Sequence, residues 1–211
     1  MSLLTNGLLF LWFAWMLWII VTFFMKKGTK RTYFACIILL LINCSNTTLK
    51  IGDYHVLLSF IVLLAGLLFF HSVAQSFYLL FSSFTICLGY TAILFWEQIT
   101  PIWMFLPRVI LIPLTLTIII TILTKQFEKR LAIGLIGITC GEIYHSFILT
   151  SYTIQEVIGD KAFFDMILTF IMLQTILEIL HKGKLAIYTF SQNIGQPLQP
   201  VKNKTRKTMN G

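Results

Sequence analysis

Two ionisable residues, Glu142 and His145, lie in the middle of the apolar stretch ITCGEIYHSFIL at 138–149. In the hydrocarbon core of a bilayer an ionisable side chain costs about 2.5–3.5 kcal/mol on insertion scales, so it usually faces a partner or water. Arg108 and Asp165, which lie in two other apolar runs, are the candidate partners. A carboxylate, an imidazole and a guanidinium at one site can form ion pairs, transfer protons or bind a polar solute.

Helical geometry predicts where these side chains point. At about 100° per residue, Gly134, Gly137 and Gly141 fall on one face of a helix, with His145 on that face and Glu142 at its edge. A glycine face lets a neighbouring helix approach closely. We therefore expect Glu142 and His145 to point into a helix bundle rather than towards lipid.

The depths of the ionisable residues are also similar. At about 1.5 Å per residue, Arg108, Glu142 and His145 come to one layer in the outer half of their helices, and Asp165 lies nearer the outer end of its own. We predict a buried polar cluster of Arg108, Glu142, His145 and Asp165. In this cluster Arg108 and Glu142 would face each other across two helices.

Three interpretations of the cluster remain open: a structural ion pair, a polar cavity for a small solute or protons, and an enzymatic site. The sequence contains no G-x-S-x-G, H-E-x-x-H or phosphate-loop motif that would support catalysis. Two E-x-x-H motifs, Glu142–His145 and Glu178–His181, resemble half-sites of di-iron bundles. They would lie about 13 Å apart along the helix axes, too far for one metal ion. We expect no catalytic residues, metal or cofactor.

The elements that carry these residues are membrane helices. Of the 211 residues, 57% are hydrophobic and 11% charged, whereas soluble domains have about 45–50% and 25%. The apolar residues form runs of about 20, the length that crosses a bilayer as an α-helix. The net charge of +8 comes from Lys and Arg residues grouped between these runs, so it does not indicate nucleic-acid binding.

We predict an all-α integral membrane bundle of seven transmembrane helices. Most of the 16 Lys and Arg residues fall at 26–31, 125–130 and beyond 180, which predicts an outside N-terminus and a cytoplasmic C-terminus. The predicted segments are Leu3–Phe24, Tyr33–Ile42, Val56–Ala74, Phe77–Trp96, Ile102–Thr124, Leu131–Ser151 and Ala162–Leu180.

The predicted domains are a transmembrane helical domain at 1–184 and a basic cytoplasmic tail at 185–211. The tail should lie at the interface first and be disordered from Ser191. Its Lys and Arg residues should attract anionic lipid, by about 1 kcal/mol per charge. The expected partners are the lipid bilayer and a membrane protein, with no nucleic acid.

These observations predict a non-enzymatic multi-pass membrane protein that is structural or a partner in a membrane complex. The alternative is a small-solute or proton transporter with a polar cavity around Arg108, Glu142 and His145.

The first apolar run and its exit, WFAWMLWIIVTFFMKK at 12–27, resemble the start of YphA-like proteins. These are small multi-pass membrane proteins of spore-forming bacilli, without an assigned activity. The chain length and the helical plan also fit this family along most of the sequence. The resemblance implies a bacterial plasma membrane and supplies no catalytic residue.

Overall fold

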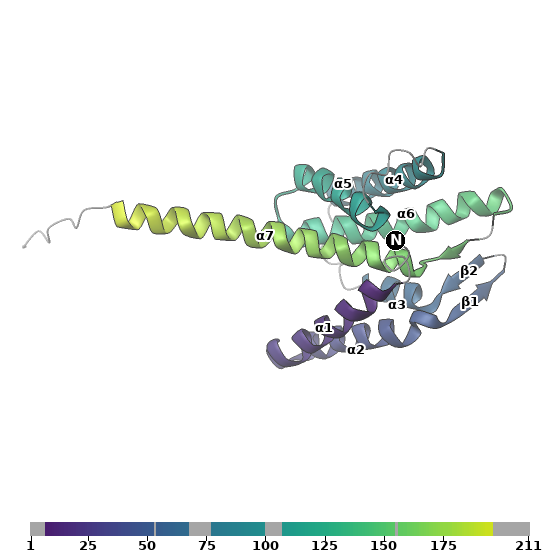
Figure 1. Ribbon diagram of the computed structural model, residues 1–211, viewed down its shortest axis with the longest axis horizontal. Helices are drawn as coiled ribbons and strands as arrows, with labels where there is room; N and C mark the ends of the chain where they lie inside the picture. Colours follow the sequence, from purple (N-terminus) through teal and green to yellow (C-terminus); the bar gives the residue numbers. More distant parts are fainter. Residues whose placement is uncertain (1–6, 53, 68–76, 100–106, 155, 196–211) are drawn as a thin grey trace, which may run out of the picture. The chain divides into compact units, whose positions relative to one another are not determined.

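The computed structural model describes residues 7–52, 54–67, 77–99, 107–154 and 156–195 (Figure 1). Most of these residues are helical, which confirms the mainly helical class. The elements in chain order are α1 (Leu8–Phe24), α2 (Thr29–Asn43), the 3-10 turn η2 (Cys44–Asn46), β1 (Thr48–Ile51), β2 (Tyr54–Leu57), α3 (Leu58–Leu67), α4 (Phe77–Ile99), α5 (Arg108–Leu123), α6 (Phe127–Ser151), β3 (Val157–Ile158) and α7 (Lys161–Gly195).

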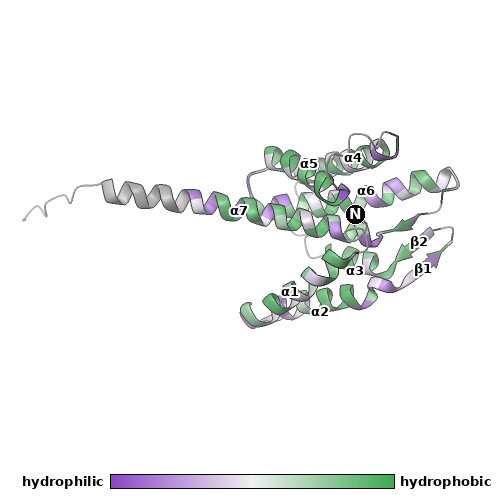
Figure 2. Cartoon of the chain, viewed as in Figure 1, coloured by the Kyte–Doolittle hydropathy of each residue, from purple (hydrophilic) through white to green (hydrophobic). Residues whose placement is uncertain are grey.

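Three stretches of the described chain are long and apolar enough to cross a membrane as helices: Phe77–Ile99, Phe127–Ser151 and Lys161–Lys184. The apolar helices α1, α3 and α5 are shorter. Hydrophobic residues run along α1, α4 and α5 (Figure 2), and many of their large side chains are exposed, including Trp12, Phe77 and Ile122. Exposed apolar surface of this extent suits contact with lipid.

Two groups of helices form the body of residues 1–175. The helix α4 packs along α6 over the most extensive contact, and α5 contacts both, while α1 packs on α2 and α2 on α3 (Figure 1). The first half of α7 adds buried side chains to the same core, including Phe163, Phe164 and Phe170.

A small sheet is the main departure from the all-α expectation. Strand β1 pairs antiparallel with β2, Thr48 opposite Leu57, and β2 pairs parallel with β3, His55 opposite Val157. Gly52 at φ 62° makes the turn after β1, in the left-handed region that favours glycine. The third strand has only two residues and lies a hundred residues further along the chain, so no local pattern predicts it.

The sheet defines the two ends of the bundle. We call the end where α6 ends, α7 begins and the strands pair the sheet end. The opposite end carries the turn between α5 and α6, at residues 124–126.

The helix α7 is longer than expected. The sequence predicted its end at Leu180 and disorder from Ser191, but the helix continues to Gly195. Residues 161–195 include no proline, and the next proline along the chain is Pro197. No proline ring therefore interrupts the hydrogen bonds of this helix. Lys182 Nζ lies 3.4 Å from Glu178 Oε1 at i,i+4, a spacing that supports a helix. The rest of the predicted tail, 196–211, lies outside the described residues.

Residues from Ile176 onwards form a second compact unit. The sequence places the boundary between a membrane domain and a tail at residue 184, and this division stays a prediction.

Candidate functional site

Glu142 is the centre of a buried polar network at the sheet end. Its side chain is 7% exposed. The Tyr90 hydroxyl, from α4, donates a hydrogen bond of 2.8 Å to Glu142 Oε2, and the backbone N–H of Gly159 donates to Glu142 Oε1 at 3.4 Å. One carboxyl group therefore joins α6 to α4 and to the turn that follows β3.

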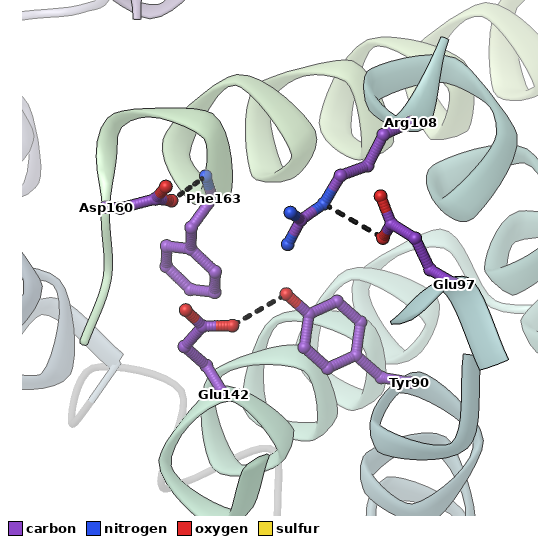
Figure 3. A network of polar contacts seen from close by, with 6 residues as sticks. All are labelled: Tyr90, Glu97, Arg108, Glu142, Asp160 and Phe163. Carbon is purple, nitrogen blue, oxygen red and sulfur yellow. Dashed lines mark hydrogen bonds and ion pairs between the residues drawn. The ribbon is translucent and has the colours of Figure 1, made fainter. Parts of the chain in front are cut away.

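The turn at Gly159 and Asp160 is built for this contact. Gly159 has φ 69°, and a Cβ on it would lie 2.5 Å from the Phe60 ring, so only glycine fits. Asp160 Oδ1 accepts a hydrogen bond of 2.8 Å from Phe163 N, which satisfies a free amide in the first turn of α7. In Figure 3 the Phe163 ring lies beside Glu142, between this turn and the Tyr90 hydroxyl.

Arg108 does not form the predicted ion pair with Glu142. It is the first residue of α5, after Pro107, so it lies at a helix end rather than deep within a span. Its Nε lies 3.3 Å from Glu97 Oε2, with side chains 38% and 23% exposed. Figure 3 shows the guanidinium turned towards the Tyr90–Glu142 pair. In the structure the partner of Arg108 is Glu97.

Asp165 belongs to another contact at the same end. Its side chain is fully buried, and its Oδ1 accepts a hydrogen bond of 2.6 Å from Phe10 N. Phe10 lies in the first turn of α1, where amides have no partner within the helix and the helix dipole favours a negative charge. Asp165 therefore connects the start of α1 to α7. Its hydrogen-bond donor, Phe10, is not a member of the predicted cluster.

His145 is buried next to an aromatic ring. It is 4% exposed, and its ring centroid lies 4.9 Å from that of Phe95. Its Nε2 has no hydrogen-bond partner among the described residues. The predicted four-residue cluster thus divides into separate contacts around Glu142, Arg108, Asp165 and His145.

The glycine face of α6 positions this network. A Cβ on Gly137 would lie 2.7 Å from Ile86 Cβ, and one on Gly141 would lie 2.7 Å from the Tyr90 ring. A Cβ on Gly134 would overlap the Phe170 ring. Gly137 and Gly141 therefore let α4 approach α6 closely, and Gly134 leaves room for the Phe170 ring of α7. The approach at Gly141 brings Tyr90 within reach of Glu142.

A hydroxyl also joins α4 to α6 beside this network. Thr91 Oγ1 donates to the carbonyl of Cys87 at 2.9 Å and lies 3.2 Å from the carbonyl oxygen of Gly141. Because hydrogen bonds between membrane helices add to helix association, this contact reinforces the approach at Gly141.

Sequence reasoning missed the two donors to Glu142. Tyr90 lies in an apolar run where aromatic residues are common, so its type alone does not single it out. The Gly159–Asp160 pair before an apolar helix does carry a signal, because glycine favours a turn and aspartate favours a helix start. Among the described residues, no three His, Cys, Asp or Glu side chains are grouped so that they could hold a metal ion.

Comparison with known proteins gives one match. The family model for YphA-like integral membrane proteins matches residues 6–199, which confirms the resemblance seen in the first helix. No curated protein and no solved structure matches the chain. With a match over nearly the whole length and several long apolar helices, the chain belongs to the family of YphA-like integral membrane proteins and resides in a membrane.

Proposed function

We propose that the protein is a non-enzymatic, multi-pass component of the cell membrane whose polar network holds the sheet end of the bundle in one arrangement. In this proposal all seven helices belong to the membrane domain, with the N-terminus outside and the C-terminus in the cytoplasm. The role is structural, or that of a partner in a membrane complex. A rigid sheet end is then the surface offered outside the membrane.

The position of Glu142 between three elements supports this proposal most strongly. Its two oxygens accept from Tyr90 and Gly159, which belong to separate elements. A buried acceptor that loses its donors costs about 1–3 kcal/mol, so this carboxyl group resists any movement of the turn after β3. Such an arrangement favours a fixed contact between α4, α6 and the turn after β3, a joint at the sheet end, over a movable one.

The local charges also favour a structural role over the binding of an anionic solute. The guanidinium of Arg108 lies between the carboxyl groups of Glu97, its ion-pair partner, and Glu142 (Figure 3). The cation is therefore already balanced by protein groups. An anion entering here would meet more negative than positive charge, which opposes its binding.

Amide hydrogen exchange in lipid nanodiscs tests the joint. Replacing Glu142 with Leu removes both acceptors, and we expect faster exchange at residues 156–160 and a lower unfolding temperature. Replacing Tyr90 with Phe removes one donor and should give a smaller change in the same direction. Tyr144→Phe is the matched control, because Tyr144 is an exposed residue of α6 and the same hydroxyl is removed.

Two results would contradict the structural role. One is unchanged exchange at 156–160 in Glu142→Leu. The other is proton or solute flux in proteoliposomes that exceeds empty liposomes and disappears in this variant while its stability is kept.

A transporter is the second candidate, supported by the buried Nε2 of His145, which lacks a partner among the described residues, and by the partly exposed Arg108. These groups could line a polar path from the sheet end. In a variant without native cysteines, His145→Cys should then react with a water-soluble thiol reagent added outside. Failure to label would remove this candidate.

A further inference from the structure

We propose that Ser82, Thr117 and Gln174 form an internal water-binding site in the core of the bundle, away from the Glu142 network. All three side chains are buried, with exposed fractions of 0%, 3% and 0%. Both amide atoms of Gln174 and both hydroxyl oxygens lack a hydrogen-bond partner among the described residues. The three residues come from three helices, α4, α5 and α7.

The hydroxyls of Ser82 and Thr117 differ from those of most threonines in the described helices. Most threonine hydroxyls donate to the carbonyl four residues earlier, the usual local partner in a helix. The hydroxyls of Ser82 and Thr117 have no hydrogen-bond partner among the described residues. The threonines with the local bond are Thr85, Thr91, Thr115, Thr121, Thr139, Thr150, Thr169 and Thr175.

The contacts of the α6 glycines place the three side chains on faces that converge. Phe170 and Ile120 pack at Gly134, and Ile86 packs at Gly137. Gln174 lies four residues after Phe170, Thr117 three before Ile120, and Ser82 four before Ile86. Residues three or four apart share a helix face. Each polar side chain therefore shares the face that meets the glycines of α6.

The same contacts give the levels along the bundle. With Gly134 as the reference and a rise of about 1.5 Å per residue, Gln174 lies about 6 Å towards the opposite end. By the same rise, Ser82 lies roughly 1.5 Å towards that end and Thr117 about 4.5 Å towards the sheet end. The three polar side chains thus lie within about 10 Å of one another along the bundle axis. One or two water molecules can bridge each gap between them.

Water is the ligand that this chemistry selects. An amide and two hydroxyls are neutral and offer both donors and acceptors, which matches water. They supply no negative charge to balance a buried cation. Buried water typically makes about three hydrogen bonds to groups that otherwise lack partners. Left dry, the four unpaired atoms would each carry a desolvation cost that water removes.

The sign of the change in unfolding temperature on substitution tests the proposal. We expect Thr117→Val, a change that keeps the side-chain shape, to lower the unfolding temperature by about 2–4 °C, because shared water loses a partner. In a dry site the same change removes an unpaired hydroxyl and leaves stability equal or higher. Thr121→Val is the matched control one turn away, because its hydroxyl already bonds the Thr117 carbonyl.

The double variant sharpens the test. Combining Thr117→Val with Gln174→Met should lower the unfolding temperature by less than the sum of the single changes, because both lose the same water. Additive shifts, or an unchanged or raised temperature in Thr117→Val, would overturn the proposal. If Gln174→Met does not fold, the cycle of Thr117→Val with Ser82→Ala carries the same test.

Discussion

The buried carboxylates at the sheet end accept hydrogen bonds from backbone N–H groups, whereas the buried amide of Gln174, further along α7, has no partner among the described residues. Glu142 and Asp165 each accept from a backbone N–H, that of Gly159 or Phe10. Gln174 finds no such donor among the described residues. The difference follows from the backbone, because a turn or a helix start leaves N–H groups free, while the interior of a helix uses all of them.

This comparison explains where a membrane bundle can place a carboxylate. At the sheet end Glu142 and Asp165 fix the joints between helices and turns. In the interior no backbone N–H is free, so a buried acceptor needs a side-chain donor or water. The glycine face of α6 connects the sheet end with the interior of the bundle. Variants in each region and at the glycine face therefore test whether polar groups are completed differently in the two regions.

The largest effect is expected at the glycine face, which affects both regions together. Gly137→Ala puts a methyl group 2.7 Å from Ile86 Cβ and 2.9 Å from the Ser83 carbonyl oxygen. Overpacking against backbone costs about 1–3 kcal/mol, and we expect the upper part of that range. Chemical denaturation in mixed micelles measures the loss.

Gly89→Ala is the control for Gly137→Ala, because nothing lies within 4 Å of a Cβ on Gly89. It should leave stability equal or raise it slightly, since alanine favours a helix. Equal losses at both positions would mean that close approach is not what Gly137 provides.

A middle-sized effect is expected at Asp165. Asp165→Ala leaves the Phe10 amide without its acceptor in a buried place, which should cost about 1–3 kcal/mol. Faster amide exchange in the first turn of α1 should accompany the loss. Asp160→Ala, which removes the side-chain cap of α7, should cost about 1 kcal/mol and leave α1 unchanged. Exchange that speeds equally in α1 for both variants would contradict the separation of the two contacts.

The smallest effect is expected at Arg108. Its pair with Glu97 is partly exposed, and such pairs contribute about 0–1 kcal/mol, so Arg108→Gln should change the unfolding free energy by no more than that. The exchanged pair, Arg108→Glu with Glu142→Arg, should not restore stability. Restoration would instead favour the direct Arg108–Glu142 pair expected from the sequence.

The sequence predicted the helical membrane class because apolar runs of membrane length leave little choice. It also predicted that Gly134, Gly137 and Gly141 share one face, since helical periodicity is local. The depth expected for Arg108 did not follow from spacing, because α5 begins at this residue.

The partners of Arg108 and Glu142 were not predictable from spacing. Whether Arg108 meets Glu97 or Glu142 depends on where α5 begins, which Pro107 decides, and on how α4 rotates against α6. The bond from Gly159 depends on a two-residue strand, β3, that pairs with a distant hairpin. Such contacts come from tertiary structure, and one sequence carries no periodic signal for them.

The most direct test of the joint at the sheet end is the coupling free energy between Tyr90 and Glu142. It comes from the unfolding free energies of Tyr90→Phe, Glu142→Leu and the double variant in one lipid or detergent system. We predict a coupling of about 0.6–1.7 kcal/mol, the upper range for hydrogen bonds between membrane helices. Losses that add within about 0.5 kcal/mol would contradict the account, because Tyr90 and Glu142 would then act independently.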